Sequence, residues 1–195
     1  MSGYEFDVFV SYIRSGNPYA WVSNHFLPRL RDCLADQLPD EPTVFVDEEM
    51  ERSANWPARL EQALNRTKVM IAVLSPQYFR SPWCLAEWDT MVERERQLGM
   101  FSDEQPHGLI YPVLFSDSDT FPDAVKVRGW RDLKQWNLPD LVFQQTIEWI
   151  GFHQQMSEIA VDLAKKLPRI PDWRPGWPAF RPDPPYRAST PLPRF

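Results

Sequence analysis

The chain has 195 residues, 43% of them hydrophobic and 14% aromatic, so it can bury the core of one domain or slightly more. Its formal net charge of −6 argues against a sequence-independent nucleic-acid binder, because such proteins need a basic face. The sequence contains no run of about 18 apolar residues, so we expect no transmembrane helix, and neither a membrane nor a nucleic acid as a partner.

The N-terminus and the cysteines predict the compartment. Residues 1–5 lack the basic and apolar regions of a secretory signal. Cys33 and Cys84 lie 51 positions apart in a chain without an export signal, a pattern typical of reduced thiols in the cytosol. We therefore expect a soluble cytoplasmic protein.

Apolar runs alternate with amphipathic segments along the chain. Five runs are interpreted as strands, the fifth of them weak: 6–12, 43–47, 68–74, 109–115 and 132–136. Helices are expected to begin near Asn17, Asn55 and Ser81, and a last helix is expected over 143–167. This alternation predicts an α/β fold, with a parallel sheet covered by helices on both faces.

Three residues predict local irregularities within these elements. Pro28 removes one helical hydrogen bond, so the first helix is expected to kink or to start late. Pro112 indicates that the fourth strand is an edge strand or is irregular. Gly151 is a possible break in the last helix.

A change in composition near Leu167 predicts a domain over 1–167 and a tail over 168–195. The tail holds nine of the 20 prolines and five arginines against two aspartates, a net charge of +3. It is either a disordered linker, a strap that lies on the domain, or a polyproline-type segment that meets a partner or a downstream domain. Its aromatic residues favour the last two interpretations.

The predicted sheet brings several chemically able side chains to one edge. In open parallel sheets, ligands bind outside the carboxyl ends of the strands. Those ends fall at 11–16, 47–56, 75–87 and 116–119. The fold therefore places Arg14, Asp47, Trp56, Trp83 and Glu87 at the same edge.

Glu87 belongs to a helix whose start is well marked. Ser81 is a typical N-cap, and Pro82 occupies the first helical position, where its missing N–H costs nothing. An apolar stripe of Leu85, Trp88 and Val92 leaves Glu87 off the expected buried face. Glu87 is either a solvated carboxylate or a functional one, and it has neither a capping-box position nor an ion-pair partner four residues away.

Other chemistries at this edge have weaker support. A nucleophilic Cys84 would need a nearby base, and none of the three histidines is placed there, so a semi-buried helix residue is favoured. Asp47 follows the second strand rather than the third, which excludes the phosphoacceptor position of receiver domains. No Gly-rich phosphate loop and no metal-ligand spacing occur. Arg14 either reaches an anion or is solvated, and Trp56 either stacks on a ligand or packs on the helix.

Three motifs in order resemble Toll/interleukin-receptor (TIR) domains. They are Tyr-Glu-Phe-Asp-Val-Phe-Val-Ser-Tyr-Ile-Arg at 4–14, Val-Phe-Val-Asp at 44–47, and Leu-Ser-Pro at 74–76 followed by Ser-Pro-Trp-Cys-Leu-Ala-Glu at 81–87. The resemblance covers about residues 4–165. It implies a flavodoxin-like α/β fold around a central parallel five-stranded sheet.

The resemblance also implies two kinds of function. Many bacterial, plant and axonal TIR domains cleave NAD⁺ to ADP-ribose or cyclic ADP-ribose-type signals, whereas receptor and adaptor TIR domains are noncatalytic assembly modules. In the catalytic branch the glutamate at the Glu87 position acts, residues at Arg14 and Trp56 hold the nucleotide, and Ser11, Asp47, Trp83 and Cys84 line the same edge. NAD⁺ is then the substrate, with no metal and no further cofactor.

The segment 48–55 departs from the family pattern in two ways: it lacks the Pro-Gly of receptor TIR domains, which weakens the adaptor interpretation, and it is more acidic than expected for binding a pyrophosphate. Glu87 with its aromatic neighbours, as the catalytic branch requires, favours the bacterial NAD-cleaving type, an NAD⁺ nucleosidase in antiviral defence or cell-death signalling. In catalytic relatives a neighbouring protomer often completes the site, so we expect homotypic self-association to activate the chain. A noncatalytic adaptor module is the alternative, and a transferase of ADP-ribose is a third interpretation.

Overall fold

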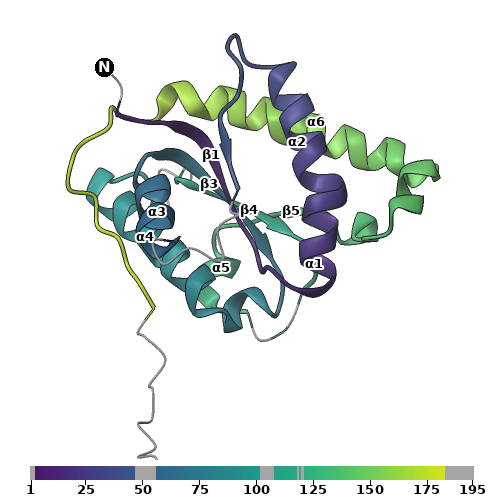
Figure 1. Ribbon diagram of the computed structural model, residues 1–195, viewed down its shortest axis with the longest axis horizontal. Coiled ribbons are helices and arrows are strands. Elements are labelled where there is room, and N and C mark those ends of the chain that lie inside the picture. Colours follow the sequence, from purple (N-terminus) through teal and green to yellow (C-terminus); the bar gives the residue numbers. More distant parts are fainter. Residues whose placement is uncertain (1–2, 47–55, 102–107, 118, 120, 183–195) are drawn as a thin grey trace, which may run out of the picture.

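The computed structural model describes residues 3–46, 56–101, 108–117, 119 and 121–182. Five strands form one sheet in the order β2-β1-β3-β4-β5, and every neighbouring pair is parallel (Figure 1). They are β1 (Phe6–Ser11), β2 (Val44–Phe45), β3 (Thr67–Leu74), β4 (Ile110–Leu114) and β5 (Arg131–Asp132). This confirms the α/β prediction, and the strand order is the flavodoxin-like one.

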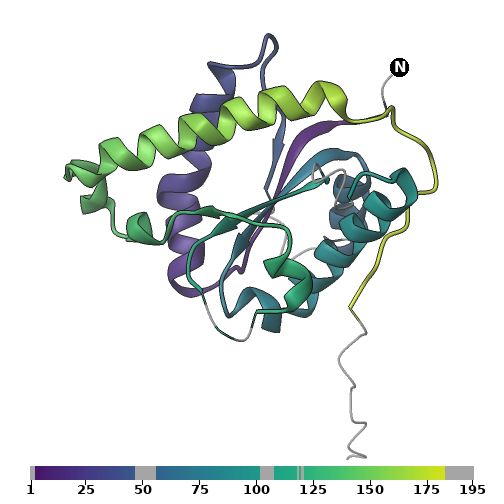
Figure 2. The same cartoon turned by 180° about the vertical axis from the view of Figure 1, so that it is seen from behind.

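Within the residues that the structure describes, six α-helices cover the two faces of the sheet. They are α1 (Gly16–Trp21), α2 (Leu27–Ala35), α3 (Trp56–Asn65), α4 (Pro82–Leu98), α5 (Asp123–Lys126) and α6 (Glu148–Lys166). Figures 1 and 2 show α1, α2 and α6 on one face, and α3, α4 and α5 on the other. Within the described residues, none of the helices combines the length and the hydrophobicity that crossing a bilayer requires.

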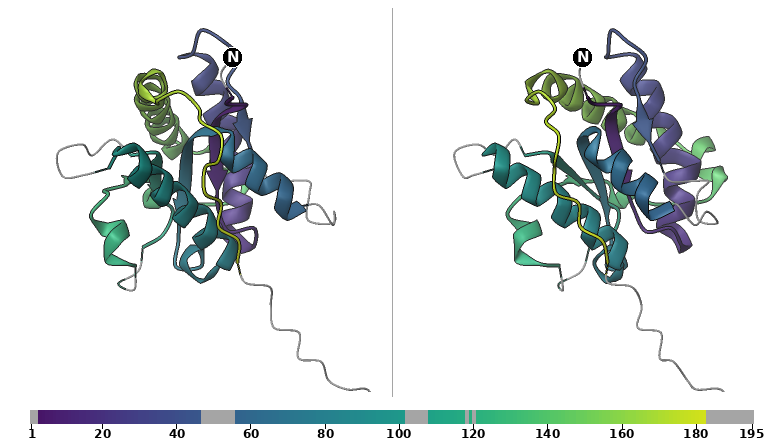
Figure 3. Two further views of the ribbon diagram at one scale, coloured as in Figure 1. Left: turned by 90° about the vertical axis from the view of Figure 1, so that its left-hand side faces the viewer. Right: turned by 60° about the vertical axis from the view of Figure 1, so that its left-hand side comes forward.

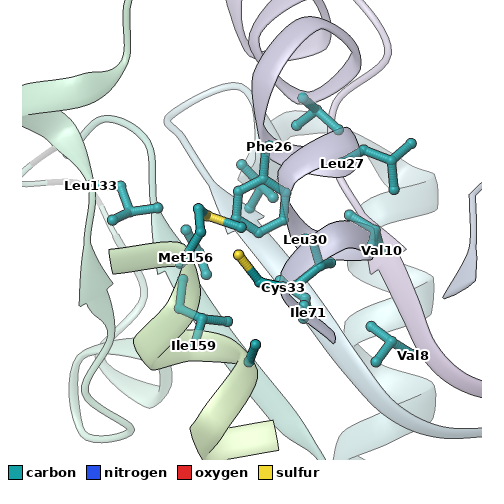
Figure 4. Close-up of a cluster of buried hydrophobic side chains, with 14 of the residues drawn as sticks. Val8, Val10, Phe26, Leu27, Leu30, Cys33, Ile71, Leu133, Met156 and Ile159 are labelled. Carbon is teal, nitrogen blue, oxygen red and sulfur yellow. The ribbon is translucent and has the colours of Figure 1, made fainter. Parts of the chain in front are cut away.

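The central strand β3 supplies side chains to two separate cores. Val69, Ile71 and Val73 pack against α2 and α6, while Met70 and Leu74 face α3 and α4. Figure 4 shows the first core, in which Cys33 lies among apolar side chains of α2 and α6. Covering on both faces explains why this strand is continuously apolar rather than alternating.

The irregularity expected at Pro28 takes the form of a π-helical segment, Val22–Phe26, between α1 and α2. The backbone stays helical on both sides of this segment. Pro28 has no N–H to donate to the carbonyl of Asn24, and the side-chain amide of Gln144 donates to that oxygen instead, at 3.1 Å. Gln144, 120 positions after Asn24 in the sequence, therefore supplies a donor in place of the N–H that Pro28 lacks.

Pro112 lies in an inner strand, so the prediction of an edge strand is wrong. Phe115 N donates to Leu74 O in β3, so the nitrogen of Pro112, three residues earlier, faces β5 instead. The described residues of β5 pair with Val113 and Leu114, one step further along. The missing N–H of Pro112 therefore lies next to the first paired residue of the β4–β5 ladder and outside the described pairing, so the strand tolerates the proline.

Two boundaries near the end of the domain also differ from the predictions. The last helix begins at Glu148 rather than at 143, after a 3₁₀ turn over Leu141–Gln145. It is unbroken at Gly151, where a Cβ atom would lie 3.1 Å from Trp136 Nε1. Gly151 therefore allows close approach of the Trp136 ring. The predicted fifth strand is the two-residue β5 followed by a 3₁₀ turn, Lys134–Trp136.

Residues 171–182 lie as a strap along α3 and α4 (Figure 3). Trp173 Nε1 donates to the carbonyl of Asn65 at 3.1 Å, and Phe180 N donates to Thr90 Oγ1 at 2.9 Å. The guanidinium of Arg94 lies over the Trp177 ring, 4.9 Å from its centroid. For the described part of the tail, these contacts correspond to the strap interpretation.

The buried face of α4 differs from the predicted apolar stripe. Trp88 is buried, but Leu85 and Val92 are only half-buried. Glu87, Arg94 and Glu95 are buried in their place, together with apolar residues of the same face. The difference arises because α4 contacts the sheet on one side and the strap on another, so a single stripe does not describe its burial.

Glu95 connects α4 to the start of β4. It is 1% exposed and forms a bidentate pair with Arg128, with donor–acceptor distances of 2.9 and 2.5 Å. Its Oε1 atom also accepts hydrogen bonds from the backbone N–H groups of Leu109 and Ile110. The Arg128 guanidinium and the two backbone N–H groups therefore all donate to the same carboxylate, that of Glu95.

We expect Glu95→Leu to lower the free energy of unfolding by about 3–5 kcal/mol, because it leaves a buried guanidinium and two backbone donors without an acceptor. Urea denaturation measures the change. Glu93→Leu is the matched control, since Glu93 pairs with Arg96 at the surface of the same helix. Equal losses in the two variants would contradict this account of Glu95.

Candidate active site

A cavity of about 430 Å³ lies at the carboxyl ends of the neighbouring strands β1 and β3. The chain passes from β1 to β2 on one side of this pair and from β3 to β4 on the other side, so the strand order reverses between β1 and β3. This is the switch point at which ligands bind in sheets of this strand order. Its size is within the usual range for a small-molecule site. The lining residues are Tyr12, Ile13, Arg14, Ser15, Trp56, Ser81, Trp83, Cys84 and Glu87.

Glu87 is 5% exposed, so the interpretation as a solvated carboxylate is wrong. The predicted cap holds the start of its helix, because Ser81 Oγ accepts from Cys84 N at 3.3 Å and Pro82 is the first helical residue. Ser11 Oγ, at the end of β1, donates to Glu87 Oε2 at 2.5 Å. The carboxylate is thus fixed from a strand 76 positions away in the sequence.

Tyr78 extends this contact into a buried relay. Its hydroxyl lies 2.8 Å from Ser11 Oγ. Burial raises the pKa of Tyr78 well above its usual value, and the nearby Cys84 and Glu87 act in the same direction. Tyr78 therefore remains a phenol and donates to Ser11, which uses its only proton to donate to Glu87. The relay orients the carboxylate.

Cys84 lies on the cavity wall, but its thiol is unreactive. Burial, followed by the negative charge of Glu87, raises the pKa of the Cys84 thiol to about 12. A thiol that stays protonated is a poor nucleophile. This agrees with the interpretation of Cys84 as a small helix residue beside the site.

Two tryptophans and an arginine form another part of the cavity wall. The rings of Trp56 and Trp83 meet edge to face with their centroids 4.3 Å apart. The guanidinium of Arg14 lies over the Trp56 ring, 4.8 Å from its centroid. Trp56 therefore packs on its neighbours and lines the cavity at the same time, so its two interpretations are compatible.

The structure brings Arg14, Trp56, Trp83, Cys84 and Glu87 together around one cavity. Ser11 is not on its wall but lies behind Glu87, to which it donates. Asp47 and the acidic segment 48–55 lie outside the described residues. Among the residues that the structure describes, no three His, Cys, Asp or Glu side chains are grouped as metal ligands would be.

Tyr78 is a site residue that the sequence patterns did not single out, as are Tyr12, Ile13 and Ser15 of the cavity lining. Tyr78 lies in a 3₁₀ turn, Tyr78–Arg80, between β3 and α4, inside the segment 75–87 that was already placed at the ligand edge. The available signal was an aromatic residue with a hydroxyl in that segment. Nothing in the local pattern shows that this hydroxyl points back to Ser11.

We expect iodoacetamide to leave Cys84 unmodified in the native protein at about pH 8, since roughly one thiol in ten thousand is then ionised. Cys33 is also buried with a raised pKa and should behave alike. Both should react in denaturing urea, as peptide mass mapping would show. Rapid labelling of native Cys84 would contradict the protonated, buried thiol.

Comparison with known proteins identifies the family. The family model described as TIR domain matches residues 8–163. The TIR domain of the Toll-related receptor TRR-2 from Hydra magnipapillata is 17% identical, with 77% of this chain and 98% of that chain covered and a TM-score of 0.45. The TIR domains of the activated Roq1 resistosome, which directly recognizes the pathogen effector XopQ, are 18% identical, with 83% and 84% covered and a TM-score of 0.42. A search of curated proteins finds no match. Because the family model spans most of the chain, this protein belongs to the TIR-domain family.

Proposed function

We propose that this TIR domain cleaves the N-glycosidic bond between nicotinamide and ribose in NAD⁺, releasing nicotinamide and ADP-ribose or a cyclic form of it. The observation that carries the proposal is Glu87, a buried carboxylate held by Ser11 on the wall of a cavity. A buried carboxylate with a dedicated donor, facing a ligand-sized space, is typical of a functional group rather than of a surface charge.

The reaction needs few groups. Nicotinamide in NAD⁺ is already a cationic leaving group, so no general acid has to protonate it. Its departure leaves a positively charged, oxocarbenium-like ribosyl centre, as in glycoside hydrolysis. Glu87 would stabilise that charge and hold the ribose hydroxyls. Water then adds to C1 of the ribose and loses a proton, which gives ADP-ribose, or a ring nitrogen of the adenine adds instead and gives the cyclic form.

The remaining wall suits the other parts of the dinucleotide. The paired rings of Trp56 and Trp83 offer flat surfaces for a base and shield the ribosyl centre from bulk water. Arg14, beside Trp56, supplies a positive charge for the pyrophosphate. The protonated Cys84 thiol borders the carboxylate without competing with it for the ribosyl centre.

We further propose that self-association activates the domain in a defence or cell-death response. Five large apolar side chains between β5 and the first turn of α6 are 43–74% exposed: Leu138, Leu141, Val142, Ile147 and Ile150. Exposed apolar side chains that gather in one region are typical of protein–protein contacts. The same region supports the alternative function, a noncatalytic assembly module, because assembly alone needs no turnover.

We expect Glu87→Gln to reduce nicotinamide release by about 100-fold or more, since the group that stabilises the ribosyl charge is lost. The assay uses concentrated or bead-clustered protein with NAD⁺, and mass spectrometry of the second product separates hydrolysis, cyclisation and transfer. Asp89→Asn, an exposed carboxylate two residues further along α4, is the matched control. A folded, clustered wild-type chain that releases no nicotinamide would overturn the enzyme and leave the assembly module.

We expect Ser11→Ala to lower kcat by roughly tenfold with little change in KM, because Ser11 orients Glu87 and does not line the cavity. Tyr78→Phe removes only the outer donor of the relay and should have a smaller effect. Steady-state kinetics of both variants measure the difference. An unchanged kcat in Ser11→Ala would refute the positioning role.

A further inference from the structure

A second cavity, of about 530 Å³, lies where β4 and β5 begin, against the last turns of α6. Figures 1 and 2 both show the end of α6 beside the amino end of β1, so this cavity is at the edge of the sheet opposite Glu87. Its lining includes Tyr111, Arg128, Trp130, Lys165, Lys166 and Arg169.

The lining carries five cationic side chains and one carboxylate, in a chain whose formal net charge is −6. Two of the cations are already paired, Arg128 with Glu95 and Arg131 with Asp162 and Glu158. The other three are Lys165, Lys166 and Arg169. Within the part of the chain that the structure describes, they form no ion pair with a carboxylate.

Lys166 is the most informative of the three, because its side chain is half-buried. Its ammonium lies 5.9 Å from the centroid of the Tyr111 ring. Burial lowers the pKa of Lys166 to about 8; the charge of Arg128 acts in the same direction, and the carboxylates of Glu95 and Asp162 oppose it only in part. The protein therefore holds a cation partly out of water, at a cost that a bound anion would offset.

Helix electrostatics explain only part of this cluster. Cations in the last turn of a helix interact favourably with its C-terminal carbonyl groups, which accounts for the exposed Lys165. The same interaction is available to a solvated side chain, so it gives no reason to bury Lys166 against a cavity. It also gives no reason for Arg169, beyond the helix end, to share that lining.

The rest of the lining is apolar or aromatic. Met100, Ile110 and Ile170 contribute aliphatic surface, and Trp130 lines the cavity while remaining 37% exposed. Small-molecule sites usually combine such surface with a few placed polar groups. Cations beside a partly exposed indole suit a ligand that has both a multiply charged anionic end and a flat ring.

We propose that this cavity binds a phosphorylated small molecule with a flat ring, of the nucleotide class. Its phosphates lie among Lys165, Lys166 and Arg169, and its ring lies against Trp130. The site is separate from the cavity at Glu87, so it does not rest on the NAD⁺-cleaving function.

Titration calorimetry of the full chain tests the proposal with three probes: ADP, pyrophosphate and adenosine. We expect ADP to bind most tightly, pyrophosphate more weakly and adenosine weakest, because the ring adds to a mainly ionic contact. The double variant Lys165→Gln/Arg169→Gln should weaken ADP binding by roughly tenfold or more. Arg31→Gln/Lys126→Gln removes the same charge from exposed positions outside the cavity and should leave the affinity nearly unchanged.

ADP is also a part of NAD⁺, so Arg14→Gln identifies binding at the first cavity. If Arg14→Gln weakens ADP binding and Lys165→Gln/Arg169→Gln does not, ADP binds beside Glu87 and the proposal is overturned. If Lys165→Gln/Arg169→Gln and Arg31→Gln/Lys126→Gln weaken ADP binding equally, the proposal is also overturned, because net charge alone would then determine the affinity. Absence of binding by both ADP and pyrophosphate would also overturn it.

Labelling provides a measurement that needs no variant. The aldehyde of pyridoxal phosphate condenses with a lysine amine, with loss of water, to an imine that borohydride reduces to a stable amine. We expect peptide mapping to find the label at Lys165 or Lys166, with excess ADP preventing it. Label spread over surface lysines regardless of ADP would overturn the proposal.

Discussion

The hydrogen bond from Ser11 to Glu87 is the contact on which the candidate site depends. A carboxylate removed from water needs donors close by, and here the donor comes from the end of β1 while the carboxylate comes from α4. Tyr78, in the turn between β3 and α4, closes the relay. Three segments are therefore fixed relative to one another, and the start of α4 is set so that Trp83 meets Trp56.

Much of this arrangement follows from local sequence. The apolar runs predict the five strands, Ser81 and Pro82 predict the start of α4, and the meeting of strand ends in a parallel sheet places Arg14, Trp56 and Glu87 together. The burial of Glu87 does not follow, because its donor is 76 positions away. A pattern of apolar residues cannot show that a polar one finds a distant partner, so the stripe through Leu85 and Val92 was the wrong face.

The same limit applies to the breaker residues. Considered alone, Pro28 and Gly151 are each unfavourable in a helix, so Pro28 predicts a kink or a late start and Gly151 predicts a break. In the fold, the side chain of Gln144 serves the carbonyl that Pro28 leaves without a donor, and Gly151 gives room to Trp136. Both residues are placed by contacts across the domain. Local propensity identified an irregularity near Pro28 but not its form, and the break that it indicated at Gly151 does not occur.

The strap gives α4 a mechanical connection to the end of the described chain. Phe180 bonds to Thr90 and Trp177 packs on Arg94, about one and two turns after Glu87. Arg94 in turn donates to the hydroxyl of Tyr4, so both ends of the described chain meet on this helix. A tension applied beyond Arg181 therefore reaches α3, through the Arg181–Glu61 ion pair, and the helix that carries Glu87, through the Phe180–Thr90 hydrogen bond, before it reaches the sheet.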